Sequence, residues 1–129
     1  MTPSRLILMA TAAVAAVCGA ALLFAPEEIL RALGGGALAP PAASFALQIC
    51  GGALFGFAML NWMARGTRVG GIYARPLALA NFLQWGSGAV TWSHLWRAGA
   101  HPPLVVAATT AWLLCALAFA YLLFFHDPI

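Results

Sequence analysis

Residues 75–97 read RPLALANFLQWGSGAVTWSHLWR, an apolar segment that begins and ends with arginine. At 100° per residue, four small or polar residues of such a helix fall within one arc of about 80°. These residues are Asn81, Gln84, Gly88 and Thr91, with Ser87 and His94 just outside the arc. Because an unpaired polar group in hydrocarbon is costly, we expect this polar stripe to face other helices.

The composition of the whole chain is that of an integral membrane protein. Of its 129 residues, 64% are hydrophobic and 7% are charged, and the mean hydropathy is +0.93. Soluble domains carry about 25% charged residues. Since one crossing uses about 20 residues, the length allows about four transmembrane helices and no sizeable soluble domain. We expect a single all-α domain over residues 1–129, a four-helix transmembrane bundle with short loops. Its helices should lie at about 5–25, 42–64, 74–97 and 103–125.

The first predicted helix is followed by a short amphipathic segment. The apolar run after Arg5 is near 20 residues, longer than the apolar part of a typical signal peptide, so we expect a retained membrane helix. Pro26 ends this helix. The next residues, PEEILRALGGG, predict a short interfacial helix. Its lipid-facing residues should be Ile29, Leu30 and Leu33, and its water-facing residues Glu27, Glu28 and Arg31.

Small residues recur at the four-residue spacing that lets membrane helices approach closely. In the second helix, Gly52 and Gly56 form a GxxxG pair. The same spacing occurs at Ala12, Ala16 and Ala20 in the first helix and at Ala107, Ala111 and Cys115 in the fourth. The pattern predicts tight helix packing and carries no information about catalysis.

The arginines fall unequally on the two sides of this predicted topology. One side would hold Arg5, Arg65, Arg68 and Arg75, and the other Arg31 and Arg97. The positive-inside rule then places both termini in the cytoplasm. Because the arginines are spread over several loops, they form no concentrated phosphate-binding face, and we exclude nucleic acid as a partner.

Few residues suggest catalysis or a metal. No acidic or basic side chain lies in the central part of a predicted helix, which argues against a proton-coupled transporter. The cysteines Cys18, Cys50 and Cys115 form no close pair and are expected to be small core residues. The histidines His94, His101 and His126 do not lie at matched depths on two helices, so we expect no haem or metal site. We identify no catalytic residue and expect no enzymatic activity and no obligatory cofactor.

The candidate ligand-binding or helix-contact residues are Gln84, Trp85, Thr91 and His94. Trp85 follows Arg75 by ten residues, about 15 Å along a helix, and therefore lies near the bilayer midplane. An interfacial aromatic belt explains Trp92 and Trp96 but neither Trp85 nor Trp112, which lies at similar depth. The favoured interpretation is helix packing. The alternative is a small pocket in which tryptophan stacks on a lipid, quinone or pigment.

Three segments resemble a broad group of small bacterial four-helix membrane proteins, loosely related to the DoxX-like group. They are LFAPEEILRALGG at residues 23–35, GGALFGFAMLNWMAR at residues 51–65, and ANFLQWGSGA at residues 80–89. Such proteins often carry an arginine near the start of the second helix, where this chain has Gln48. The resemblance implies a compact four-helix fold in a bacterial inner membrane and no specific activity.

Three functions remain open at this point. The favoured one is a non-enzymatic accessory or structural subunit that packs against a larger membrane complex, or against further copies of itself. The second is a small oligomeric carrier or channel that uses the polar stripe as its path. The third is a redox component that holds a quinone, haem or pigment near Trp85 and His94.

Overall fold

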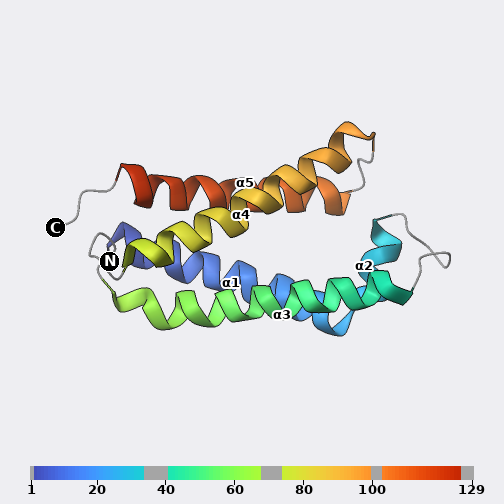
Figure 1. Cartoon of the computed structure of the whole chain (residues 1–129), viewed down its shortest axis with the longest axis horizontal. Coiled ribbons are helices and arrows are strands. Elements are labelled where there is room, and N and C mark those ends of the chain that lie inside the picture. Colours follow the sequence, from blue (N-terminus) through green and yellow to red (C-terminus); the bar gives the residue numbers. More distant parts are fainter. Residues whose placement is uncertain (1, 34–40, 68–73, 100–102, 126–129) are drawn as a thin grey trace.

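The computed structural model describes residues 2–33, 41–67, 74–99 and 103–125, and in these ranges the chain is helical and contains no strand. Figure 1 shows its helices. They are α1 (Pro3–Phe24), α2 (Pro26–Ala32), α3 (Pro41–Met63), the 3-10 turn η2 (Ala64–Gly66), α4 (Ala74–Arg97) and α5 (Pro103–Phe124). Proline opens α1, α2, α3 and α5, because its fixed φ suits a helix start and its missing N–H would have no partner there.

Three of these segments are long and apolar enough to cross a membrane, as in a multi-pass membrane protein. They are α1, α5 and the continuous segment Pro41–Gly66 formed by α3 and η2. A helix of 22 residues, the length of α1, spans about 33 Å, slightly more than a hydrocarbon layer of about 30 Å. The fourth long helix, α4, has 24 residues but carries the polar stripe and lacks the apolar character of the other three.

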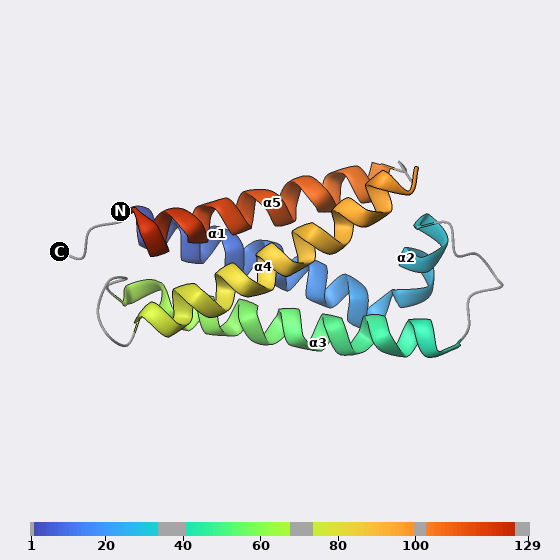
Figure 2. The same cartoon turned by 45° about the horizontal axis from the view of Figure 1, so that its top comes forward.

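The long helices form two antiparallel pairs, α1 with α3 and α4 with α5, and α1 also contacts α5. Figures 1 and 2 show that the pairs meet at the end where α1 begins and α5 ends. Toward the end that carries α2, α4 and α5 diverge from α1 and α3. The molecule therefore has a closed end and an open end.

Two glycines set the distance between α1 and α3. A Cβ atom on Gly19 would lie 2.8 Å from the carbonyl oxygen of Gly51, and one on Gly51 would lie 2.9 Å from that of Gly19. By contrast, no atom lies within 4 Å of the corresponding position on Gly52 or Gly56. The expectation that Gly52 and Gly56 pack tightly is thus wrong within this chain. In a helix apolar on every face, the sequence does not reveal which glycine faces its neighbour.

A polar cluster joins three helices near the closed end. The side chains of Asn61 on α3 and Asn81 on α4 exchange two hydrogen bonds of 2.8 Å each, and both are fully buried. Asn61 Nδ2 also donates to Thr11 Oγ1 on α1 at 3.2 Å. Asn81 therefore makes the interhelical contact expected of the polar stripe, because pairing with Asn61 satisfies its amide away from water.

Candidate functional site

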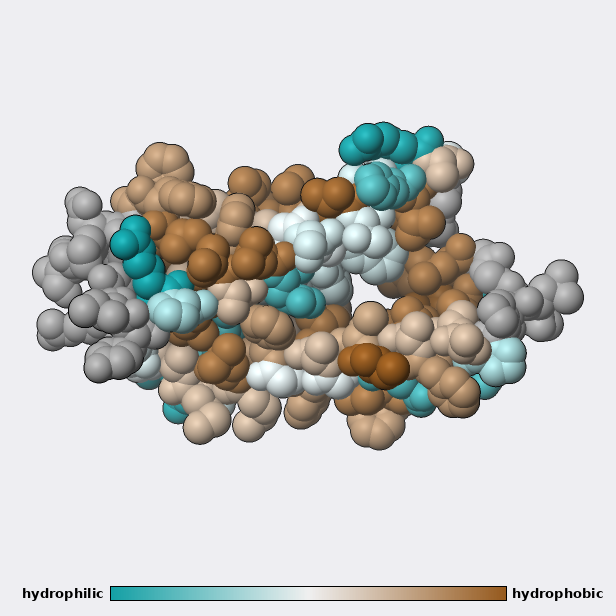
Figure 3. All heavy atoms as spheres, viewed as in Figure 1, coloured by the Kyte–Doolittle hydropathy of each residue, from teal (hydrophilic) through white to brown (hydrophobic). Residues whose placement is uncertain are grey.

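A pocket of about 540 Å³ lies between the two helix pairs, in the half where they diverge. This volume falls within the range of about 300–1,000 Å³ typical of small-molecule sites. Figure 3 shows a gap through the surface in this half, bordered by α4 above and α3 below. Much of the lining is aliphatic, with Leu22, Leu33, Leu47, Leu54, Leu95 and Leu104.

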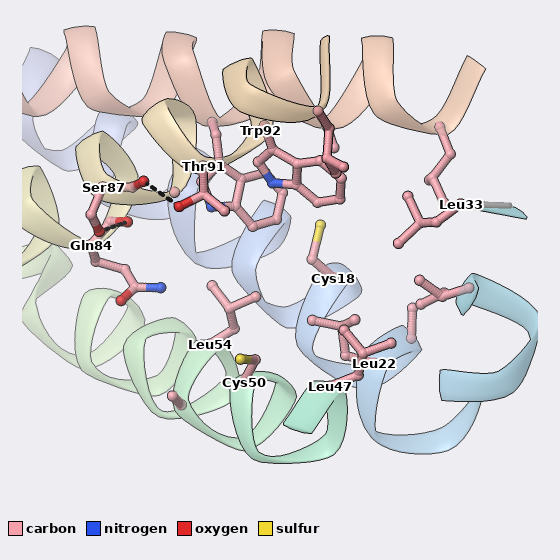
Figure 4. Close-up of a pocket in the computed structure, with 18 residues that line it drawn as sticks. Cys18, Leu22, Leu33, Leu47, Cys50, Leu54, Gln84, Ser87, Thr91 and Trp92 are labelled. Carbon is pink, nitrogen blue, oxygen red and sulfur yellow. Dashed lines mark hydrogen bonds between the residues drawn. The ribbon is translucent and has the colours of Figure 1, made fainter. Parts of the chain in front are cut away.

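The polar stripe of α4 forms one wall of the pocket. Ser87 Oγ donates to the carbonyl oxygen of Gln84 at 3.2 Å, and Thr91 Oγ1 donates to that of Ser87 at 3.0 Å. The side-chain amide of Gln84 has no hydrogen-bond partner among the described residues. In Figure 4 this amide extends from α4 into the space above α3. Gln84 is thus the one group of this wall with both a free donor and a free acceptor in the part of the chain described.

Two tryptophans form a second wall. Trp92 on α4 and Trp112 on α5 both line the pocket, with ring centroids 6.0 Å apart and planes at 65°. Trp112 also packs against Trp85, with centroids 5.2 Å apart and planes at 69°. Trp85 lies behind this wall, fully buried, and its Nε1 atom has no hydrogen-bond partner among the described residues.

Gly88 determines where the Trp112 ring can lie. A Cβ atom at this position would overlap Cδ1 and Nε1 of Trp112. Only glycine leaves room for the indole to pack directly against the backbone of α4. Gly88 was predicted as part of the polar stripe, and its contact is with an aromatic ring on α5.

Two of the three cysteines also face the pocket. Cys18 on α1 and Cys50 on α3 line it, and Figure 4 shows their sulfur atoms on neighbouring helices. Cys115 is buried, as expected of a small core residue, whereas Cys50 is exposed, so the core prediction is wrong for Cys50. All three are free thiols.

Helix α2 covers the surface end of the pocket. Glu27, Glu28 and Arg31 are exposed, as predicted for a helix at the interface. Ile29 and Leu33, however, line the pocket. The expectation that both face lipid is therefore wrong, because the divergence of the helix pairs gives their side chains an apolar surface to cover.

The four candidate residues occupy different surroundings. Gln84 and Thr91 line the pocket, Trp85 is buried behind it, and His94 is exposed outside its lining. His101 and His126 lie outside the described residues. In the described ranges, no group of three or more His, Cys, Asp or Glu side chains could hold a metal ion.

Several lining residues have no signal in the sequence. Cys18, Cys50, Ile29 and Leu33 enter the site only because α1, α3 and the segment of α2 lie together along one side of the pocket. For Trp112, its position at mid-depth in the membrane indicated from the sequence a contact with a ligand or another helix. The polar groups that face the pocket are neutral amide, hydroxyl, thiol and indole groups, which suit the binding and orientation of a ligand.

The chain matches no protein-family model, no curated protein and no solved structure.

Proposed function

We propose that this protein binds a lipid-soluble amphipathic molecule inside the bilayer, without catalysing a reaction. The observation that carries the proposal is the Gln84 amide, which faces the pocket of about 540 Å³ without a protein partner among the described residues. An unpaired amide in an apolar setting costs about 1–3 kcal/mol by mutational measurement. A polar group on a ligand removes that cost, and the leucines and tryptophans accept the ligand's apolar part.

The proposed setting is a four-crossing protein of a bacterial inner membrane. Arg75 and Arg97 at the two ends of α4 support its crossing beside α5, since long basic side chains reach the interface from helix ends. Arg5, Arg65 and Arg75 belong to segments at the closed end, and Arg31 and Arg97 to segments at the open end. This distribution supports a cytoplasmic closed end, with both termini on that side.

A second candidate is an accessory subunit of a larger membrane complex, or a homo-oligomer. It is favoured by the outer face of α3, where Gly52 and Gly56 are exposed together with Phe45, Ile49 and Met59. A GxxxG pair on an exposed face suits a close approach by another helix. The two candidates are compatible, because this face lies outside the pocket.

The carrier or channel has less support. A path across the bundle would have to pass the closed end, where Leu8 and Phe119 are fully buried and Asn61 pairs with Asn81. The pocket lining stops short of these residues.

The test uses Gln84→Leu in the full-length protein, purified in a mild detergent and measured by native mass spectrometry and thermal unfolding. Removal of an unpaired amide should leave the ligand-free protein as stable as the wild type or more stable. The same change should lower retention of a co-purified small molecule, because it removes one hydrogen bond to the ligand. The matched control is Gln48→Leu, because the Gln48 amide donates to Leu23 O at 3.2 Å outside the pocket. Ligand retention unchanged by Gln84→Leu, or a wild-type protein that carries no small molecule, would refute the proposal.

A further inference from the structure

We infer that the pocket selects an uncharged ring compound with a carbonyl group, and holds the carbonyl oxygen at Gln84 and the ring against Trp92 and Trp112. This inference rests on the proposed function and names the chemical class of its ligand. Its basis is the position of the polar wall relative to the bilayer, the charge of the lining, and the shape of the aromatic wall.

The polar wall begins near the middle of the membrane. Gln84 lies ten residues after Ala74 and 13 before Arg97, which correspond to about 15 Å and about 20 Å along α4. The hydrocarbon layer is about 30 Å thick, so the Gln84 amide lies near its midplane. A phospholipid keeps its charged head group at the membrane surface, far from this amide.

The polarity of the pocket runs opposite to that of a phospholipid. At its surface end, Ile29, Leu33 and Leu104 are apolar, whereas the polar side chains Gln84, Ser87 and Thr91 lie along α4, with the Gln84 amide at the deep end. A lipid that entered tail first would place its acyl chain against the amide and leave the amide unpaired. A molecule with its polar group at the deep end satisfies both regions.

The lining contains no charged side chain among the described residues. The acidic residues of α2, Glu27 and Glu28, are exposed to water and are not part of the lining. A charged group next to Gln84 would have no counterion and would be costly at this depth. The ligand group at Gln84 is therefore neutral, and a carbonyl oxygen accepts directly from the Gln84 Nε2 donor.

The aromatic wall favours a flat ligand. The Trp92 and Trp112 rings stand at 65° to each other and form two sides of a corner, and Gly88 allows Trp112 to lie directly against α4. Aromatic rings prefer edge-to-face or offset stacked contacts, which such a corner offers to a third ring. An aliphatic chain needs no such arrangement.

Benzophenone is the probe, because it is an uncharged aromatic ketone that cross-links on irradiation to groups close to its carbonyl. Binding to the full-length protein in detergent is measured by tryptophan fluorescence quenching, corrected with a free tryptophan analogue in the same micelles. We expect saturable quenching, and photolabelled peptides from residues 84–92 of α4 and from the segment around Trp112. Gln84→Leu should weaken binding about tenfold, the loss of one hydrogen bond. Gln48→Leu should leave it unchanged.

Two charged probes distinguish this inference from the proposed function. Oleate and phosphatidylglycerol should not compete with benzophenone. If either competes while Gln84→Leu leaves benzophenone binding intact, the inference on ligand class fails and a lipid-binding function survives. If benzophenone labels only lipid-facing surfaces and no amphipathic molecule binds in the pocket, both the inference on ligand class and the proposed function fail.

Discussion

Coupling between Asn61 and Asn81 gives the sharpest test of how the two helix pairs are joined. Each side chain is fully buried, and the two exchange hydrogen bonds of 2.8 Å in both directions across α3 and α4. The perturbation is a double-mutant cycle of Asn61→Leu, Asn81→Leu and the double variant. Leucine has a similar size and no polar atom, so it removes the bonds and leaves little cavity.

The expected magnitude follows from the number of bonds and the burial of the pair. An interhelical hydrogen bond in a membrane protein contributes about 0.6 kcal/mol on average and about 1.7 kcal/mol at most. Two such bonds give a coupling energy of about 1–3 kcal/mol. Asn81→Leu alone strands the Asn61 amide, which keeps its bond to Thr11, and should destabilise the protein by about 2–3 kcal/mol. The double variant leaves neither amide buried without its partner, so its destabilisation should be smaller than the sum of the destabilisations of the single variants.

The assay is reversible unfolding of the full-length protein in mixed micelles with increasing SDS, followed by circular dichroism. Asn61→Leu combined with Gln48→Leu is the control, since 13 residues of α3 separate these positions, about 20 Å along the helix. These two changes should be additive within about 0.5 kcal/mol. A coupling energy for Asn61 and Asn81 below about 0.5 kcal/mol would refute the packing of α3 against α4 through this pair.

Of three further predictions, the first two use the same preparation and the third uses intact cells. Gly19→Ala should destabilise the protein by about 1–3 kcal/mol in the SDS assay, because the added Cβ meets Gly51. The control Gly52→Ala should be neutral or stabilising. Equal effects of the two changes would contradict the contact between α1 and α3. Gly88→Ala should lower the free energy of unfolding by about 1–3 kcal/mol, because the added Cβ overlaps the Trp112 ring. Most of this destabilisation should disappear when the change is made in a protein that already carries Trp112→Ala. A destabilisation that persists in that background would show another cause. Alkaline phosphatase fused after residue 129 should be inactive and a fusion after residue 99 active in intact cells; the reverse pattern would invert the proposed orientation.

The helices themselves could be predicted from local properties of the sequence. Each long helix begins and ends within two residues of its expected range, because apolar runs of crossing length are interrupted by proline and glycine. Asn81 was predicted to contact another helix, since a polar side chain at that depth requires a partner. Hydropathy alone identifies three membrane-spanning candidates, because the polar stripe lowers the apolar character of α4.

The candidate site could be predicted only in part. Gln84 and Asn81 share one stripe, but Asn81 finds Asn61 at the closed end, while Gln84 reaches the divergent half and faces a pocket. Helical periodicity gives the face of a side chain and not the distance to the next helix. The sequence therefore could not tell a contact from a cavity.

The residues from Arg75 to Arg97 show which properties depend on the sequence alone and which depend on the tertiary structure. By itself the sequence determined that these residues form a helix, that polar and aromatic side chains share its inner face, and that the surrounding chain is a membrane protein, because these properties depend on composition and period. Only the tertiary structure decided that Gly19 and Gly51 close one helix pair, that Trp112 rests on Gly88, and that α2 covers an open pocket beside Gln84. These contacts depend on helix crossings, and in helices that are apolar all round, crossings are set by close packing between distant segments.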